Sequence, residues 1–254
     1  ALTKANFWSN FKTNWVILDC EIMPWSFKSA GLMQRNYAAC YSAGKEDISK
    51  SHISLLHIDS AYNLNPLNPS KKIEKEFKDE TPPNIENLSN VYFEKHRTLD
   101  KFKKSYQRYC WSVKSIDDIQ IAPFHILATE GKVHDRQSHV WHMKQIGNIW
   151  SNDSSGTTFG TWWRQCDLND KNSVKEAINW WEDMTSNGEE GMVVKPYNFL
   201  SEYVDQLHGP SYLQPAVKVR GREYLRIIYG HDYDSPKNLE KLKRRGLKRK
   251  RMLA

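Results

Sequence analysis

Two runs decide the fold of this chain: Glu189-Glu-Gly-Met-Val-Val-Lys195 and Gln214-Pro-Ala-Val-Lys-Val-Arg-Gly-Arg-Glu-Tyr-Leu-Arg226. The first run carries a short apolar stretch, Met192–Val194, between a Ser-Asn-Gly turn signal and a proline. A short apolar run bounded by such breakers predicts a buried strand. Glu190 then stands at the entrance of that strand, and Lys195 stands at its exit.

The second run alternates apolar and charged residues over Ala216–Arg220, which predicts another strand with Lys218 and Arg220 on one face. One carboxylate and three cations at strand ends predict a pocket for a phosphate group and its divalent metal ion. Carboxylate oxygens suit Mg²⁺ or Mn²⁺, which makes Glu190 the metal candidate, and lysine ammonium groups act as point charges on phosphate oxygens. The alternative is that these charges form only a solvated rim.

The run Glu190–Lys195 resembles motif IV of the covalent nucleotidyltransferases, the superfamily of DNA ligases, RNA ligases and mRNA capping enzymes, and Lys218–Arg220 stands where motif V is expected. The longer string Gln214–Gly230 is similar to the ligase (adenylyltransferase) domain of the bacterial polynucleotide kinase–phosphatase RNA repair enzymes. The resemblance implies an α+β fold, the ATP-grasp-like ligase fold of antiparallel sheets packed with helices. It also implies that residues 1–230 form a partial nucleotidyltransferase domain with motifs III to V, and that residues 231–254 begin a C-terminal helical module.

A third run, Trp15–Ile22, is nearly continuous in apolar residues and predicts a strand buried on both faces. Asp19 and Glu21 interrupt it two positions apart and are therefore expected to point to the same side. Leu18–Ser26 resembles motif III of the same ligases, which implies that Glu21 contacts the ribose of a bound nucleotide. The alternative is a strand end that reaches solvent.

Ile119–Ala128 predicts a pair of core strands. The stretch resembles motif IIIa, in which an aromatic side chain lies against the purine, and Phe124 is the candidate. A phenylalanine in a strand is by default a core residue, which is the alternative.

Four histidines lie close together in the sequence: His125, His134, His139 and His142. Imidazole is a common zinc ligand, so a zinc site is one hypothesis, although the spacing matches no familiar zinc motif. His139 and His142 are three residues apart, which on a strand would place them on opposite faces. Contacts with RNA or a structural role are the favoured alternatives.

Helices are predicted over Leu32–Ala61 and Glu94–Cys110, and a capping box at Ser173–Glu176 predicts the start of another. The apolar face of that last helix is expected to bury Val174, Ala177, Ile178, Trp181 and Met184. Between the first two helices, Asn63–Asn90 is rich in proline and asparagine and predicts a solvated connector, with one charged helix from Lys71 to Phe77.

Near the C-terminus, Ser235-Pro236 predicts the start of a helix, and Leu247 the start of a further one. The basic cluster from Lys241 to Arg251 either contacts RNA phosphates or is a solvated helix end.

Composition narrows the class of partner. The 254 residues carry a net charge of +7, and ten tryptophans supply core filler or stacking surfaces for bases. This charge favours an anionic partner, and nucleic acid rather than membrane because no apolar anchor is present. The cysteines form no CxxC pair, so we expect reduced thiols in a cytoplasmic protein. They are Cys20, Cys40, Cys110 and Cys166.

The resemblance implies a reaction in three steps. A lysine takes AMP from ATP, the AMP passes to the 5′-phosphate of RNA, and the 3′-hydroxyl then displaces AMP and seals the strand. The implied catalytic residues are Glu21, Glu190, Lys195 and Lys218, and the implied nucleotide-binding residues are Glu21, Phe124, Lys195, Lys218 and Arg220.

The nucleophilic lysine of motif I is expected ahead of motif III, and no lysine upstream of Glu21 has the required pattern. Lys4 and Lys12 lack the following glycine, and Lys28 comes after motif III without the arginine of the pattern. We therefore expect a fragment that lacks motif I and the N-terminal strands of the domain, and that forms no lysyl–AMP adduct by itself.

Other functions remain open at this point. One is a non-catalytic RNA-binding or assembly module derived from the ligase fold, another is a zinc-dependent hydrolase, and a third is a capping guanylyltransferase, which would use GTP in place of ATP. The expected substrate is RNA with 5′-phosphate and 3′-hydroxyl ends. By family resemblance, a kinase–phosphatase portion and an RNA 2′-O-methyltransferase are the expected partners.

Overall fold

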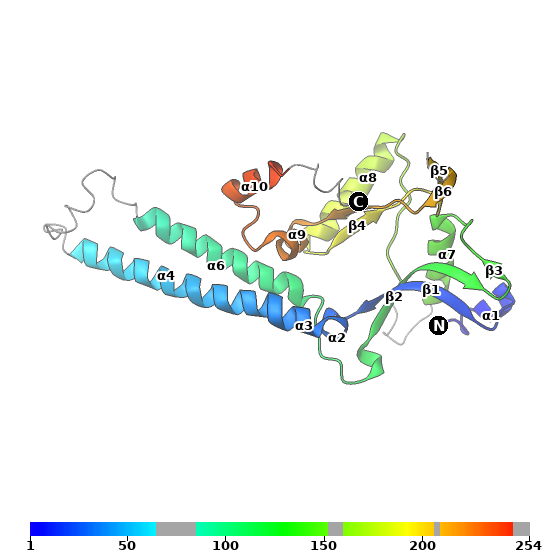
Figure 1. Ribbon diagram of the computed structural model, residues 1–254, viewed down its shortest axis with the longest axis horizontal. Coiled ribbons are helices and arrows are strands. Elements are labelled where there is room, and N and C mark those ends of the chain that lie inside the picture. The colour runs from blue at the N-terminus through cyan, green and yellow to red at the C-terminus, as the bar shows by residue number, and fades with distance from the viewer. Residues whose placement is uncertain (65–84, 152–159, 206–208, 246–254) are drawn as a thin grey trace. The chain divides into compact units, whose positions relative to one another are not determined.

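The chain divides into two compact units (Figure 1). The computed structural model describes residues 1–64, 85–151, 160–205 and 209–245. Unit 1 comprises Ala1–Ala30 and Tyr109–Tyr224, and unit 2 comprises Gly31–Arg108 and Leu225–Ala254. The boundary predicted at residue 230 stays a prediction. In the described part of the chain, no helix combines the length and apolar character that a membrane span needs.

Unit 1 is built on small antiparallel sheets. Its largest sheet has three strands in the order β1 (Val16–Met23), β2 (Gln120–Thr129) and β3 (Lys132–Val133). A separate two-stranded sheet pairs β5 (Ser201–Asp205) with β6 (Gly209–Leu213). The predicted first strand is confirmed, whereas the predicted pair of core strands is the single strand β2.

One face of β1 is open to solvent. Ile17 is 52% exposed, and Asp19 on the same face is exposed too, so the expectation that both faces are buried is wrong. Val16 and Leu18, on the other face, pack against the core of the unit. The strand is thus amphipathic, with alternation that its apolar composition conceals.

The pairing of β1 with β2 shifts its register beside Phe124. Asp19 pairs with His125, and the next residue, Cys20, pairs with Pro123. Phe124 is therefore left without a partner residue on β1. A strand irregularity of this kind re-aims a side chain, and such irregularities are common beside functional sites.

The core of unit 1 lies between β2, α1 (Phe7–Phe11) and α7 (His139–Trp150). Its buried apolar residues are Phe7, Ile126, Ile146, Ile149 and Trp150. Three short helices link the larger elements: α2 (Trp25–Lys28), α3 (Ala30–Leu32) and the 3-10 helix η2 (Ile116–Asp118).

A second two-stranded sheet pairs β4 (Gly191–Val194) with β7 (Val217–Arg220), which confirms both short strands predicted from the two deciding runs. Val193 is 46% exposed and Val194 is 47% exposed. The prediction that this strand is buried is therefore wrong, because within the described residues β4 and β7 pair only with each other.

Helix α8 (Lys171–Ser186) leads into β4 as predicted, but its N-terminus differs. Asp170 is the N-cap, and its side chain accepts the Asn172 N–H at 2.9 Å. The predicted capping box is wrong, because Ser173 lies inside the helix and its hydroxyl accepts the Asp167 N–H at 2.9 Å. Of the predicted apolar face, Val174, Ala177, Trp181 and Met184 are half-buried, whereas Ile178 is exposed.

Unit 2 contains a helical hairpin. The π-helix η1 (Met33–Ala38) continues into α4 (Ala39–Leu64), which packs against α6 (Ile85–Gln107). The buried residues of these helices include Tyr41, Ile48, Leu99, Phe102 and Tyr106. Both predicted helices are confirmed, and α6 also takes in the end of the predicted connector. The charged helix predicted over Lys71–Phe77 lies outside the described residues.

The chain passes from unit 1 to unit 2 within α9 (Arg222–Tyr229). Arg226 is 2% exposed, and its guanidinium donates to both carboxylate oxygens of Asp234, at 2.7 Å and 2.6 Å. The helix α10 (Pro236–Lys243) begins after Ser235, as predicted. The helix predicted from Leu247 lies outside the described residues.

Candidate functional site

Glu190 and Arg220 form an ion pair where β4 begins and β7 ends. Arg220 Nη1 donates to Glu190 Oε1 at 2.5 Å, and the guanidinium carbon lies 4.4 Å from the ring centre of Tyr224. The strand register brings the pair together, because Gly191 lies opposite Arg220 in the β4–β7 ladder. The Gly221 N–H also donates to the Glu190 carbonyl at 2.8 Å. Backbone pairing therefore fixes where both charges stand.

Gly191 is required for this approach of the two strands. Its φ is +114°, and a Cβ atom placed there would lie 2.1 Å from the Val219 carbonyl oxygen. Glycine is the residue that adopts such a backbone conformation without a steric penalty. The glycine that follows Glu190 in the sequence thus has a structural reason.

Lys28, at the end of α2, interacts electrostatically with both Glu21 on β1 and Glu190. It forms an ion pair with Glu21. Burial lowers the pKa of Lys28, and the negative charge of Glu190 opposes that shift. Burial raises the pKa of Tyr224, and the charge of Glu190 adds to the increase. Two carboxylates from distant parts of the sequence therefore lie near one ammonium group.

Asp19, His125 and Lys195 form a second polar line. His125 Nδ1 lies 2.9 Å from Asp19 Oδ2, and His125 Nε2 lies 3.3 Å from Lys195 Nζ. His125 is 2% exposed, and burial lowers its pKa. The hydrogen bond to the Asp19 carboxylate acts in the opposite direction and raises the pKa. Burial also lowers the pKa of Lys195, while Asp19 opposes that shift. The imidazole is therefore neutral at pH 7, and one of its nitrogens can accept a hydrogen bond.

Phe124 lies beside the same lysine. The Lys195 ammonium is 5.7 Å from the centre of the Phe124 ring, and the ring is half-buried. The register shift on β2 accounts for this position, since it removes Phe124 from the regular ladder. The role of Phe124 beside the purine stays a prediction.

Most of the predicted site residues thus fall into two neighbouring groups in unit 1. Glu21 and Glu190 with Arg220 make one group, and Phe124 with Lys195 makes the other; β1 joins them through Asp19 and Glu21, two positions apart. Lys218 lies opposite Val193 in the ladder and is exposed, and its side chain forms no hydrogen bond or ion pair with any described residue.

A divalent metal fits this donor set. Glu21 pairs with Lys28, Glu190 pairs with Arg220, and the charge of Glu190 also acts on the Lys28 ammonium. Mg²⁺ takes hard oxygen ligands and is usually held by one or two carboxylates together with substrate phosphates. Glu190 therefore remains the candidate ligand, with Glu21 close to the same position.

The remaining histidines pack behind His125. His139 and His142 lie on α7, not on a strand. Their rings lie 5.2 Å and 5.3 Å from that of His125. Burial lowers the pKa of His139 to about 4 and that of His142 to about 3. Among the described residues, no group of three or more His, Cys, Asp or Glu side chains is placed to hold a metal ion, which leaves the zinc hypothesis without support.

Sequence reasoning gave no nucleotide-site role to Asp19, Lys28 or Tyr224, and it considered His125 only as a zinc ligand, an RNA contact or a structural residue. Signals existed for two of them: Asp19 interrupts an apolar strand two residues before Glu21, and His125 directly follows Phe124. Lys28 and Tyr224 carry no comparable signal, because only the fold brings them to Glu21 and Glu190.

Comparisons with known proteins identify the family and the fold of the chain. The family model described as PNKP adenylyltransferase domain, ligase domain matches residues 1–254. A solved structure titled "Structure of Pnkp1/Rnl/Hen1 complex" contains a similar chain, with 20% sequence identity and a TM-score of 0.59. The match covers 98% of this chain and 62% of that chain. No curated protein matches the chain. The predicted fold class, small antiparallel sheets packed with helices in a nucleotidyltransferase-type fold, is confirmed.

Proposed function

The chain belongs to the PNKP ligase family of adenylyltransferase domains, and we propose that it serves ATP-dependent sealing of RNA ends. Its part is to hold the ribose, the α-phosphate region and the divalent metal. The observation that carries the proposal is the approach of Glu21 and Glu190 to the same Lys28 ammonium group. Glu21 comes from the motif III run and Glu190 from the motif IV run, so two motifs distant in sequence meet at one place.

In the reaction, an amine nitrogen forms a bond to the α-phosphorus of ATP, and the bond to pyrophosphate breaks. An oxygen of the RNA 5′-phosphate then takes the AMP, and the 3′-hydroxyl displaces AMP to form the phosphodiester. A bound Mg²⁺ or Mn²⁺ neutralises charge that develops on the phosphoryl oxygens. Lys195, Lys218 and Arg220 add positive charge around that phosphate, Glu21 holds the ribose, and Phe124 stacks on adenine.

We place the nucleophile outside these 254 residues. No lysine ahead of Glu21 has the family pattern. In addition, apolar side chains on two sheets are exposed to solvent, which would suit a further layer of the fold packed against them. Val217 is 64% exposed and Ile17 is 52% exposed. Exposed apolar patches of this kind mark surfaces that bind another segment or protein.

Labelled ATP tests the assignment. The chain is incubated with [α-³²P]ATP and Mg²⁺ and run on a denaturing gel. We expect no covalent adduct from the chain alone, and an adduct once the polypeptide with the motif I lysine is joined to it. An adduct on the chain alone that disappears in Lys28→Arg would move the nucleophile to Lys28 and overturn the motif assignment.

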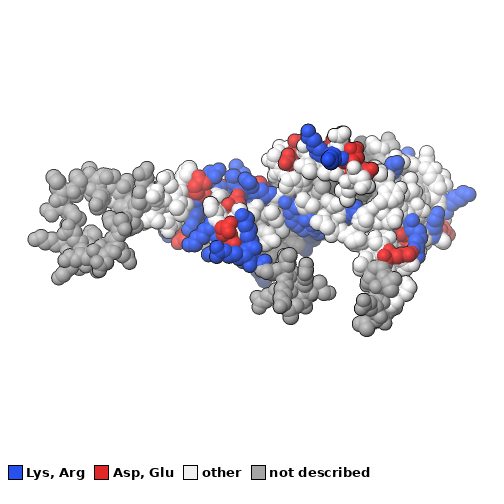
Figure 2. All heavy atoms as spheres, turned by 90° about the horizontal axis from the view of Figure 1, so that it is seen from above, with Lys and Arg blue, Asp and Glu red and all other residues white. Residues whose placement is uncertain are grey.

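The alternative is a non-catalytic RNA-binding or assembly module with the same fold. Lys and Arg side chains gather with Asp and Glu on the helices of unit 2 (Figure 2), and the whole chain carries a net charge of +7. ATP affinity separates the candidates: a ligase part binds ATP with Mg²⁺, a capping relative prefers GTP, and an assembly module binds neither. The proposed partners are a kinase–phosphatase portion and an RNA 2′-O-methyltransferase. The proposed location of this assembly is the cytoplasm.

A further inference from the structure

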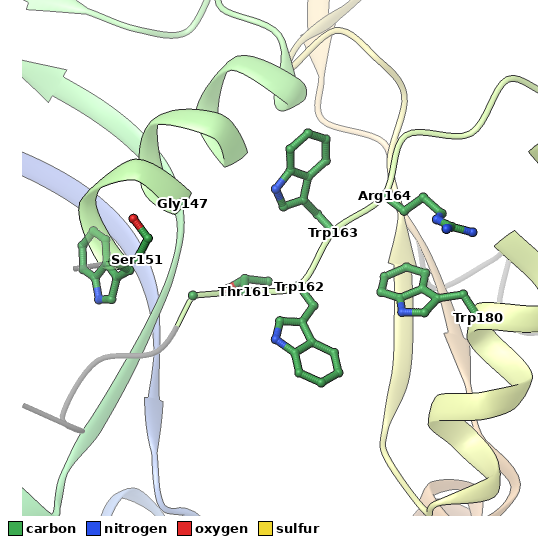
Figure 3. Close-up of a pocket in the computed structure, with 9 residues that line it drawn as sticks. Gly147, Ser151, Thr161, Trp162, Trp163, Arg164 and Trp180 are labelled. Atoms are coloured by element: carbon green, nitrogen blue, oxygen red, sulfur yellow. The ribbon is translucent and has the colours of Figure 1, made fainter. Parts of the chain in front are cut away.

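Several of the ten tryptophans meet at one cavity of unit 1. Its volume is about 600 Å³, and it lies between the end of α7, the segment 160–164 and α8. Figure 3 shows Trp162 and Trp163 turned to opposite sides of that segment, with Trp180 reaching toward them from α8. The function proposed above assigns nothing to these indoles.

Two hydrogen bonds attach this cavity to the strands of the candidate site. The Thr161 hydroxyl donates to the Pro123 carbonyl at 2.9 Å, one residue before Phe124 on β2. The Trp181 indole N–H donates to the Val219 carbonyl on β7 at 2.9 Å. The walls of the cavity are therefore fixed to both sheets that carry the nucleotide-binding candidates.

Two of the tryptophans at the cavity are unusually open to solvent. Trp162 is 78% exposed and Trp163 is 38% exposed. An indole left in water forgoes the stabilisation that its large apolar area provides when buried. Accessible aromatic rings held on a firm backbone are the stacking platforms with which proteins bind single-stranded nucleic acid.

Polar groups at the cavity suit a nucleotide. Arg164 lines it and pairs with Glu176 at 3.4 Å; both side chains are solvent-accessible, so the pair contributes little stability and a phosphate group can replace Glu176. Trp150 also lines the cavity, and its buried indole N–H finds no acceptor among the described residues. A base carbonyl or a phosphate oxygen would supply one.

From these contacts we infer that the cavity binds a base of single-stranded RNA, stacked on Trp162 with its phosphate beside Arg164. The inference rests on the proposed function, because RNA is the strand on which that function acts. The net charge of +7 favours an RNA strand over an aromatic peptide as the occupant. The cavity is thus a subsite for an RNA end, adjoining the place proposed for ATP.

The test is a titration of the 254-residue chain into a fluorescein-labelled, 5′-phosphorylated oligoadenylate RNA, followed by anisotropy. Trp162→Ala is expected to weaken binding about tenfold, and Trp162→Phe to stay within about threefold because a phenyl ring still stacks. Trp15→Ala is the matched control, since Trp15 is 44% exposed at the start of β1, away from the cavity. Circular dichroism melting shows that each variant is folded.

Salt dependence gives a second readout. Arg164→Gln is expected to lower the slope of log affinity against log salt by about 0.7, the value for one phosphate contact on a single strand. Unchanged RNA affinity in folded Trp162→Ala overturns the inference, and so does Trp162-dependent binding of a proline-rich peptide in place of RNA. The proposed function is tested separately by ATP binding: a chain that binds no ATP contradicts it. The RNA titration can still be interpreted in that case.

Discussion

The Lys195 ammonium lies 3.3 Å from His125 Nε2, and one tautomer of the imidazole serves both of its contacts. With the proton on Nδ1, His125 donates to the Asp19 carboxylate at 2.9 Å and accepts from Lys195 on the other nitrogen. His125 is therefore a positioning residue that holds the lysine beside Phe124.

Removal of His125 should weaken ATP binding through Lys195. We expect His125→Ala to lose about tenfold in affinity for Mg-ATP, in line with a hydrogen bond to a charged group, and His125→Gln to recover most of it because its amide oxygen replaces Nε2. Calorimetric titration measures both. His57→Ala, at an exposed position on α4, is the control. Equal affinity in all folded variants would rule out the positioning role.

The buried histidines predict a stability that falls in mild acid. The pKa is about 4 for His139 and about 3 for His142, below the ordinary 6.5 of the unfolded chain. The unfolded state therefore binds more protons below pH 6.5, and stability is lost as the pH falls. We expect roughly 2 kcal/mol less unfolding free energy per histidine at about pH 5 than at about pH 7. Urea titrations followed by tryptophan fluorescence measure it.

The substitution His142→Asn measures how much of this pH dependence of stability comes from His142. His142 Nδ1 accepts the Ile126 N–H at 3.2 Å, and the amide oxygen of asparagine can take over that bond. His142→Asn should flatten the pH dependence of stability, whereas His57→Asn should leave it unchanged. A parallel pH profile for His142→Asn and the parent chain contradicts the assignment.

Glu190→Gln should uncouple nucleotide binding from the metal ion. The substitution removes the charge that pairs with Arg220 and the carboxylate proposed to bind Mg²⁺. We expect the Mg²⁺-dependent part of ATP affinity to fall about tenfold or more. Glu202→Gln is the control, because Glu202 pairs with the exposed Arg136 at 3.3 Å. Superimposable Mg²⁺ titrations of Glu190→Gln and the parent would exclude Glu190 as the ligand.

Two glycine positions give a matched comparison of backbone strain. Gly191 has a φ of +114°, and a Cβ atom on it would meet the Val219 carbonyl oxygen at 2.1 Å, whereas Gly131 has a φ of +67° with open space around it. Gly191→Ala is expected to lower the unfolding free energy by about 3 kcal/mol and Gly131→Ala by about 1 kcal/mol. Urea midpoints measure both, and equal losses would mean that the carbonyl moves aside freely.

Local sequence patterns were sufficient to predict those elements whose bounds are set by neighbouring residues. The turn before Met192 and the proline after Lys195 mark the limits of β4, and the alternation around Lys218 marks β7. Ser235 and Pro236 likewise mark the start of α10. The proposed joint role of Glu190 and Glu21 came from motif resemblance, since no local rule relates residues so distant in sequence.

The wrong predictions concern features that depend on burial in the folded chain or on a competing hydrogen-bond partner. Val193 reads as a core residue, but its exposure depends on what covers β4. Ser173 fits a capping box, yet Asp170 begins the helix three residues earlier. Ser138 is the N-cap of α7, and its hydroxyl accepts the Trp141 N–H at 3.1 Å, but the sequence analysis did not predict this helix. The cavity at Trp162 needs three separate segments and has no local signature.

The unpaired position of Phe124 has an evolutionary consequence. Because no residue of β1 faces it, the side chain at this position can vary without disturbing the ladder of the sheet. Relatives of this chain that differ in their choice of purine should therefore diverge at position 124 sooner than at the neighbouring His125, which is bound on both sides. With Phe124 on the purine as proposed, a change of nucleotide preference at this position would leave the scaffold intact.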